Sequence, residues 1–431
     1  MVLPGSTAEV AAVVQACAAH GASVVPQGGN TGLVVGSVPD ATGRQVLLSL
    51  KRLQRIRALD ADNLTLTAEA GCVLQTVQEH AAAAGLLFPL SLAAEGSCTI
   101  GGNLATNAGG TQVLRYGNAR DLCLGLEVVT AQGDIWHGLS GLRKDNTGYD
   151  LRDLLIGSEG TLGIITAATL KLFPAPQAQL TAWARVANVA AAVALLNLAR
   201  ARLGPALTGF EVMGAFALQL VARHFAEQRV PFVADMAPQE MGVLLELSDS
   251  TSEAHARAQL EALLQTALEQ GHASDAVVAE SLAQSRALWH VRESIPLAQV
   301  QEGLNIKHDI SLPVSAIPDF VEHTDAALQA RHPGVRLVNF GHLGDGNLHY
   351  NVQAPAGVDG RRFLVEQEHA VNTLVFDAVA ARGGSFSAEH GIGLLKRDEL
   401  ALRKSPVALQ MMRAIKAALD PQGLMNPGRV L

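Results

Sequence analysis

The stretch that decides the fold of the N-terminal half is Glu95-Gly96-Ser97-Cys98-Thr99-Ile100-Gly101-Gly102-Asn103-Leu104-Ala105-Thr106-Asn107-Ala108-Gly109-Gly110. It is rich in glycine and contains no lysine or arginine. In such a loop, backbone N–H groups can converge on phosphate oxygens without help from side-chain cations. The stretch matches neither the strand, G-x-G-x-x-G and helix fingerprint of dinucleotide sites nor the Lys-Ser/Thr ending of a P-loop.

A second loop of the same character lies upstream, at Gln27-Gly28-Gly29-Asn30-Thr31-Gly32-Leu33. A single glycine-rich loop is most often only a turn, but two long ones in one domain point to a common ligand. We therefore predict a bulky diphosphate cofactor that is held largely by the backbone. A third loop, residues 157–163, precedes a predicted strand and is expected to form a wall of the same site.

Composition narrows the class of protein. The chain has 431 residues, which predicts two or three domains, and its hydrophobic content of 48% is ample for their cores. The net charge of −8, without a block of basic residues, argues against a nucleic-acid partner. The four cysteines lack metal-ligand spacing and read as buried small residues in a reducing compartment. Neither a signal peptide nor a continuous run of about 18 apolar residues is evident, so a cytoplasmic protein without a transmembrane segment is expected.

Apolar periodicity predicts an α+β chain. In the first part we expect a helix over 7–20, with Thr7 as N-cap, and a helix over 74–84. Strands are expected at 23–26, 46–50, 64–68, 124–130 and 164–173. After a linker near 175–178, we expect strands at 180–186 and 243–247. We also expect helices at 189–202, near 211–227, at 251–270 and at 406–419, with antiparallel strand pairing.

The segment most informative about chemistry is residues 339–351, in which His342 and His349 flank Gly344-Asp345-Gly346-Asn347. Asp-Gly-Asn is strong turn chemistry, so the chain is expected to fold back and direct both imidazoles into one pocket. Downstream, Glu389 and His390 lie in a glycine-flanked segment. Two His and one Glu form a common ligand set for a catalytic divalent metal, which would leave His390 to act as a base. The alternative is that these four residues only pack the protein.

The motifs together resemble those of the FAD-linked 2-hydroxy-acid dehydrogenases and oxidases. This group includes glycolate oxidase catalytic subunits, D-lactate dehydrogenases and D-2-hydroxyglutarate dehydrogenases. The resemblance covers nearly the whole chain. It rests on PQGGNTGL at 26–33, GSCTIGGNLATNAGG at 96–110, RKDNTGYDL at 143–151, GSEGTLGIIT at 157–166, GHLGDGNLHYN at 341–351, SAEHGIG at 387–393 and NPGR at 426–429.

The resemblance implies an FAD-binding domain of the vanillyl-alcohol-oxidase (PCMH) type over 1–176, lacking its usual N-terminal part. A ferredoxin-like α+β substrate domain with the metal site is implied over 177–400, and a C-terminal helical segment returning to the flavin over 401–431. The first glycine loop would cradle the FAD pyrophosphate, the second would wrap the flavin and diphosphate, and residues near 163–165 would lie by the adenine. The implied cofactor-binding residues are Gln27, Gly28, Gly29, Asn30, Thr31, Gly32, Leu33, Gly96, Ser97, Thr99, Gly101, Gly102, Asn103, Thr106, Asn107, Gly110, Glu159, Gly163, Ile165 and Asn426. Some relatives tether FAD through a histidine where this chain has Asn30, so non-covalent binding is expected.

The same resemblance matches His342, His349 and Glu389 to metal ligands, with Zn²⁺ the default ion and Mn²⁺ or Co²⁺ the alternatives, and it matches His390 to the catalytic base. Arg292, Lys307 and Asn351 match substrate-binding positions. Two cations favour a diacid such as D-2-hydroxyglutarate. Two residues differ from the pattern of the hydroxyglutarate enzymes and argue against this substrate. Pro296 stands where those enzymes carry a pocket threonine, and Ser91 replaces an aspartate of their flavin loop.

The implied reaction is oxidation of a D-2-hydroxy acid (D-2-hydroxyglutarate, D-lactate or glycolate) to the 2-oxo acid. The hydride would pass to flavin N5, and a metal would assist. The electrons would go on to an electron-transfer flavoprotein, a quinone or O₂. Two other classes of function remain open from the residues. One is a non-catalytic flavin subunit that relays electrons within an oxidase complex, which would need no His/Glu group. The other is a zinc hydrolase, which would leave the glycine loops unexplained.

Overall fold

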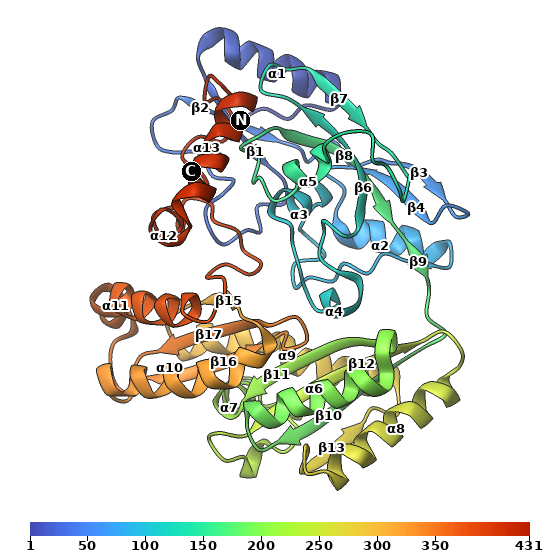
Figure 1. The fold of residues 1–431 in the computed structure, drawn as a ribbon, viewed down its shortest axis with the longest axis vertical. Coiled ribbons are helices and arrows are strands. Elements are labelled where there is room, and N and C mark those ends of the chain that lie inside the picture. The colour runs from blue at the N-terminus through green and yellow to red at the C-terminus, as the bar shows by residue number, and fades with distance from the viewer. The chain divides into compact units, whose positions relative to one another are not determined.

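The computed structural model describes residues 1–431, which divide into two compact units (Figure 1). The first unit comprises Met1–Gly110, Tyr116–Ala175 and Glu389–Leu431, and the second comprises Thr111–Arg115 and Pro176–Ala388. The chain enters the second unit briefly at Thr111–Arg115, enters it again at Pro176 and returns to the first unit at Glu389. The domain divisions at 176/177 and 400/401 stay predictions.

The first unit contains a five-stranded antiparallel sheet in the order β3-β4-β8-β6-β7. A parallel pair, β1-β2, and a short pair, β5-β9, lie outside it. The strands are β1 Ser23–Gln27, β2 Gln45–Ser49, β3 Ile56–Asp60, β4 Thr65–Glu69, β5 Leu86–Leu87, β6 Cys123–Val129, β7 Ile135–Gly138, β8 Ile164–Lys171 and β9 Phe173–Pro174. The helices are α1 Thr7–His20, α2 Leu74–Ala83, α3 Ile100–Thr106, α5 Leu151–Leu155, α12 Arg397–Arg403 and α13 Pro406–Leu419, and α4 Val113–Tyr116 begins in the second unit.

At the start of α1, the residue that was expected to cap the helix makes a tertiary contact instead. Thr7 was expected to cap this helix, but Ser6 is the N-cap and accepts a hydrogen bond from the Glu9 N–H. The Thr7 hydroxyl instead donates to Glu127 Oε1 on β6 at 2.6 Å. Both serine and threonine can cap a helix. The sequence alone therefore could not show which of the two caps α1 and which contacts a distant residue.

The second unit contains an eight-stranded sheet in the order β13-β10-β12-β11-β16-β17-β14, with β15 also pairing with β17. All of these pairs are antiparallel. The strands are β10 Ala178–Val186, β11 Leu207–Gly214, β12 Met241–Asp249, β13 Asp275–Val278, β14 Asn305–Ile306, β15 Asp309–Ser311, β16 Arg336–Gly341 and β17 Asn347–Gln353. The helices are α6 Val189–Leu203, α7 Ala215–His224, α8 Glu253–Glu269, α9 Leu282–Glu302, α10 Ile317–Arg331 and α11 Gly360–Ala380, with 3₁₀ turns at Gly204–Ala206, Val233–Asp235 and Val314–Ala316.

Helices cover both faces of this sheet. One hydrophobic cluster joins its strands to α6, α8, α10 and α11, and a second joins them to α7 and α9. Burial on both faces makes strands apolar throughout, which removes the alternation that would identify them. For that reason residues 211–214, expected to begin a helix, are the end of β11. An 18-residue window over Val189–Ala206 has the apolar composition of a membrane span. One face of α6 packs against the sheet through Leu195, Leu196 and Ala199, and 28% of the window is buried.

A buried charge network joins the first helix of the first unit to its sheet. Glu127 accepts hydrogen bonds from Thr7, from Thr166 on β8 at 2.9 Å and from Arg57 on β3 at 3.0 Å. Burial favours the neutral carboxyl, but these bonds and the arginine charge outweigh it and hold the pKa of Glu127 at about 2.

We predict that this network contributes stability that depends on pH. Because its folded pKa lies below the ordinary 4.5, the contribution is present above pH 4.5 and is lost as pH falls towards about 2. It should amount to on the order of 3 kcal/mol at neutral pH, at 1.36 kcal/mol per pKa unit. Urea unfolding of wild type and Glu127→Gln should therefore differ strongly at pH 7 and much less at pH 3. Glu79→Gln, at an exposed position of α2, is the control, and equal differences at both pH values would contradict the prediction.

Candidate functional site

The first unit encloses an open cavity built by the predicted loops. Its volume is about 920 Å³, including the solvent at its mouth, which lies within the range of cofactor pockets. The loop after β1, the segment leading into α3 and the segment before β8 all line it, and His390 lies on its wall. The three glycine-containing segments therefore meet at one site, as the sequence predicted.

The backbone of this cavity offers free hydrogen-bond donors. None of the N–H groups of residues 28–33 donates a hydrogen bond within the protein. The Thr99 hydroxyl is buried and also lacks a partner. No lysine or arginine lines the cavity. Successive free N–H groups without side-chain cations are what a diphosphate held by backbone requires, so these residues fit a dinucleotide-sized cofactor.

Two glycines allow the loops to approach each other. A Cβ added at Gly28 would lie 2.4 Å from Thr99 Oγ1, and one added at Gly29 would lie 2.1 Å from Ser97 O. Both distances are far below van der Waals contact. The two glycines are thus needed for close packing of the loops, in addition to any contact with a ligand.

The structure places most of the expected cofactor residues on the cavity wall. Those that line it are Gln27, Gly28, Gly29, Asn30, Thr31, Gly32, Thr99, Gly101, Gly102, Asn103, Thr106, Glu159, Gly163 and Ile165. Those that do not are Leu33, Gly96, Ser97, Asn107, Gly110 and Asn426. Asn426 is instead buried, and its Nδ2 donates to the carbonyls of Gly36 and Glu159.

Several wall residues were missed, among them Pro26, Val34, Ser37, Ser158 and Gly160. Ser158 and Gly160 lie within the predicted third loop but were not named individually. Pro26 and Val34 lie next to the residues named in the first loop, and Ser37 follows shortly after them.

In the second unit, residues 336–353 form the hairpin expected around the two histidines. Asp345 Oδ1 accepts a hydrogen bond from the Asn347 N–H, and Gly346 has a φ of +86°. This is the turn that the Asp-Gly-Asn sequence predicted. Phe340 on β16 is the partner of His349 on β17, and the rings of His342 and His349 lie 5.7 Å apart between centroids.

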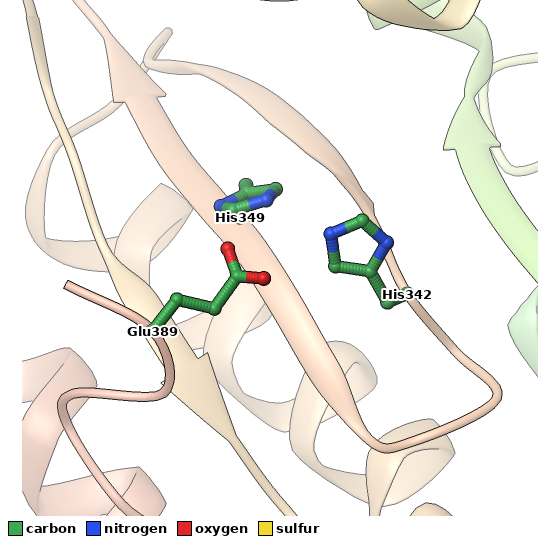
Figure 2. Close-up of side chains that lie close together, drawn as sticks. All are labelled: His342, His349 and Glu389. Carbon is green, nitrogen blue, oxygen red and sulfur yellow. The ribbon is translucent and has the colours of Figure 1, made fainter. Parts of the chain in front are cut away.

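Figure 2 shows His342, His349 and Glu389 with their polar ends directed towards one another. One potential ligand atom from each residue lies within 4.8 Å of the others. Glu389 directly follows Ala388, whose N–H donates to Asp309 O on β15. A second group that could hold a metal, Asp309, Glu389 and His390, shares the same glutamate.

A residue that the sequence analysis did not single out, Glu211 on β11, supports this group. It has no exposed surface. Its Oε1 is 2.6 Å from His342 Nδ1, and its Oε2 accepts from Arg292 Nε at 2.7 Å. Burial opposes ionisation, but the charges of His342 and Arg292 keep the pKa of Glu211 well below its ordinary value. A hydrogen bond between a ring nitrogen and a carboxylate orients the imidazole, and such a bond is usual for metal-bound histidine. The sequence feature that could have identified Glu211 is that it is the one charged residue in the strand Leu207–Gly214.

The three expected substrate residues differ in their surroundings. Arg292 on α9 is 7% exposed and lies over the Phe340 ring at 4.9 Å, and its Nη1 and Nη2 have no protein hydrogen bond. Lys307 is exposed. Asn351 is buried, and its amide accepts from His308 N and donates to Gln299 Oε1. Arg292 thus presents two free donors, whereas the amide of Asn351 already has two partners within the protein.

Two protein families match this chain. Residues 1–138 match the FAD binding domain family, and residues 175–430 match the family of FAD linked oxidases, C-terminal domain. Related proteins match over nearly the full chain. A D-2-hydroxyglutarate dehydrogenase of Xanthomonas citri pv. viticola is 41% identical, covering 99% of this chain and 88% of that protein. The mitochondrial D-2-hydroxyglutarate dehydrogenase of Bos taurus is 40% identical, covering 99% and 76%. The cytoplasmic location expected from the sequence stays a prediction.

Solved structures confirm the expected fold. A p-cresol methylhydroxylase with substrate bound superposes with a TM-score of 0.78 at 17% identity, covering 100% of this chain and 88% of that one. An alkyldihydroxyacetonephosphate synthase gives 0.73 at 16% identity, covering 99% and 75%. At these identities the likeness concerns the fold alone.

We predict that Gly29→Ala lowers the amount of bound flavin, because its Cβ would force the first loop away from Ser97. FAD bound per chain, measured in the supernatant after acid precipitation, should fall at least severalfold. An alanine substitution at Ser6, which changes only the cap of α1, should retain its FAD. Full occupancy in Gly29→Ala would show that the close loop packing is not needed.

Proposed function

The chain belongs to the FAD-linked oxidases, and from this we propose that it oxidises D-2-hydroxy acids to 2-oxo acids, with D-2-hydroxyglutarate as substrate. The observation that carries the proposal is the buried Glu211, which holds the His342 imidazole and the Arg292 guanidinium close together. We propose that the first ligates a metal and that the second binds a substrate carboxylate. The names of the relatives at about 40% identity support the same substrate.

The reaction removes a hydride from the α-carbon and a proton from the hydroxyl oxygen. When bound, FAD supplies the two-electron acceptor and a divalent metal supplies a Lewis acid for the hydroxyl and carboxylate oxygens. The protein must then bind the carboxylates, orient the α-carbon and accept the proton. We assign the proton to His390, which lies in the wall of the flavin cavity and is adjacent in sequence to Glu389.

We assign Arg292 to a substrate carboxylate because its two free Nη donors suit bidentate binding of a carboxylate. Glu211 and the Phe340 ring hold the guanidinium in place. Lys307 supplies a second cation for the other carboxylate of a diacid. Pro296 lies on the exposed face of α9 and has no side-chain donor where the resemblance implies a pocket threonine. D-lactate and glycolate are therefore the alternatives to test.

For the metal we propose His342, His349 and Glu389 as ligands, with Zn²⁺ as the ion, since N/O sets of this kind suit it. The Glu211–His342 bond favours this group over Asp309, Glu389 and His390, because it orients one ring nitrogen. In the second group His390 would be a ligand and could not act as the base.

We propose that FAD is bound non-covalently, because Asn30 has an amide where a tether would need an imidazole. Its Oδ1 already accepts a hydrogen bond from Ser37 Oγ. Reduced FAD must pass its electrons on, and we propose an electron-transfer flavoprotein or a quinone as the acceptor. A subunit that only relays electrons would need neither the His/Glu group nor a guanidinium with free donors. That alternative therefore explains fewer of the residues observed here.

We predict that substitutions in the metal group and at the base have separable effects. His349→Ala should lose the metal and the reduction of flavin by D-2-hydroxyglutarate, while it keeps FAD. His390→Ala should keep both metal and FAD but reduce flavin about 10²–10⁴-fold more slowly in a single turnover. His323→Ala, an exposed histidine on α10, is the control.

Metal analysis and anaerobic stopped-flow absorbance measure these outcomes. Loss of metal from His390→Ala would favour the second ligand group. Near-normal flavin reduction by metal-free protein would defeat the metal-assisted mechanism.

A further inference from the structure

A loop of the first unit, residues 389–395, is held by a buried carboxylate that the proposed reaction does not use. Glu159 lies in the loop before β8 and is 9% exposed. Its Oε1 accepts from the Ile392 N–H and its Oε2 from the Gly393 N–H, both at 2.7 Å. Both carboxylate oxygens therefore bind this loop, although Glu159 lines the flavin cavity as well.

The backbone on both sides is shaped for this contact. Glu159 has a φ of +53°, which is costly for a residue with a side chain. Gly391 has a φ of +79°, and a Cβ there would lie 2.7 Å from Glu159 Oε1. The absence of a side chain at Gly391 leaves room for the carboxylate, and Glu159 adopts a costly φ where it makes this contact. Such strain persists only where surrounding contacts over-determine it.

Further contacts tie the same loop to the cofactor-binding segments. The N–H groups of Leu394 and Leu395 both donate to Val34 O, directly after the first glycine loop. Asn426 Nδ2 donates to the carbonyls of Glu159 and Gly36 and so joins these two cavity segments to each other. Residues 392–395 of the loop are thus hydrogen-bonded to both segments, through Glu159 and Val34.

We propose that Glu159 is a positioning residue that sets the place of His390 and Glu389 by holding residues 391–393. The proposal rests on the function proposed above, and it goes beyond it by assigning a role to a carboxylate expected only to contact the cofactor. It also predicts that binding of FAD strengthens binding of the metal, because the loop is hydrogen-bonded to Glu159 and Val34, which both line the flavin cavity. By linkage, the metal must strengthen binding of FAD to the same extent.

The Glu159→Gln variant tests this with little change of shape. Glutamine keeps one oxygen, but it presents an NH₂ group to the second backbone donor. One of the two N–H groups then loses its acceptor, and the loop should open more often. Glu79→Gln is the matched control, since it makes the same chemical change at an exposed position of the same unit.

The primary readout is hydrogen exchange of the purified, FAD-loaded protein, which needs no substrate. In Glu159→Gln, exchange at the amides of Ile392 and Gly393 should accelerate at least tenfold relative to wild type carrying the same amount of FAD. The dissociation constant for Zn²⁺ should rise about 10–100-fold, as for other residues that orient ligands through a second contact. Removal of FAD from wild type should weaken Zn²⁺ binding. In Glu159→Gln, removal of FAD should change the dissociation constant for Zn²⁺ less than it does in wild type.

A second variant approaches the contact from the other side. Gly391→Ala should increase the same exchange rates, and the double variant should lose little more than either single one, because both disrupt one contact. Unchanged exchange in Glu159→Gln, or loss of FAD with the loop still protected, would overturn the proposal and make Glu159 a cofactor contact only. If wild type is reduced by no 2-hydroxy acid, the proposed function fails, whereas the exchange result still decides the role of Glu159.

Discussion

The second unit is organised around a carboxylate with no access to water. Glu211 accepts hydrogen bonds from His342 and Arg292, and each of its oxygens has one of them as a partner. An isolated buried carboxylate would be strongly unfavourable, and removing it would leave a buried guanidinium without its counter-charge. The two contacts orient the His342 ring and the Arg292 guanidinium. The positions of the proposed metal ligand and of the proposed carboxylate-binding group therefore depend on one residue that is assigned neither role.

The pairing of strands in the sheet explains why Glu211 can contact His342. β11 pairs with β12 on one side and with β16 on the other, and Val212 is opposite Gly341. This register brings Glu211 next to the start of the hairpin that carries His342. Helices cover both faces of the sheet, so the carboxylate lies in a rigid and dry environment. Preorganised charges in such surroundings interact more strongly than charges in water do.

Local chemistry made part of this structure predictable. Asp345-Gly346-Asn347 specified the hairpin turn, and the glycine loops specified a cavity with free backbone donors. Features that depend on distant partners were not predictable. Thr7 contacts Glu127 instead of capping α1, and burial on both faces removed the alternation of polar and apolar residues that would identify β11. Glu211 and the loop contact of Glu159 depend on partners 131 and 233 residues away.

The central claim is that the chain takes two electrons from a D-2-hydroxy acid. The most direct measurement is anaerobic addition of D-2-hydroxyglutarate, its L-enantiomer, D-lactate and glycolate to the purified flavoprotein, followed by flavin absorbance. The account predicts that about one equivalent of D-2-hydroxyglutarate bleaches the flavin while the L-enantiomer does not. A flavin that dithionite bleaches but that none of these D-acids or glycolate reduces would contradict it.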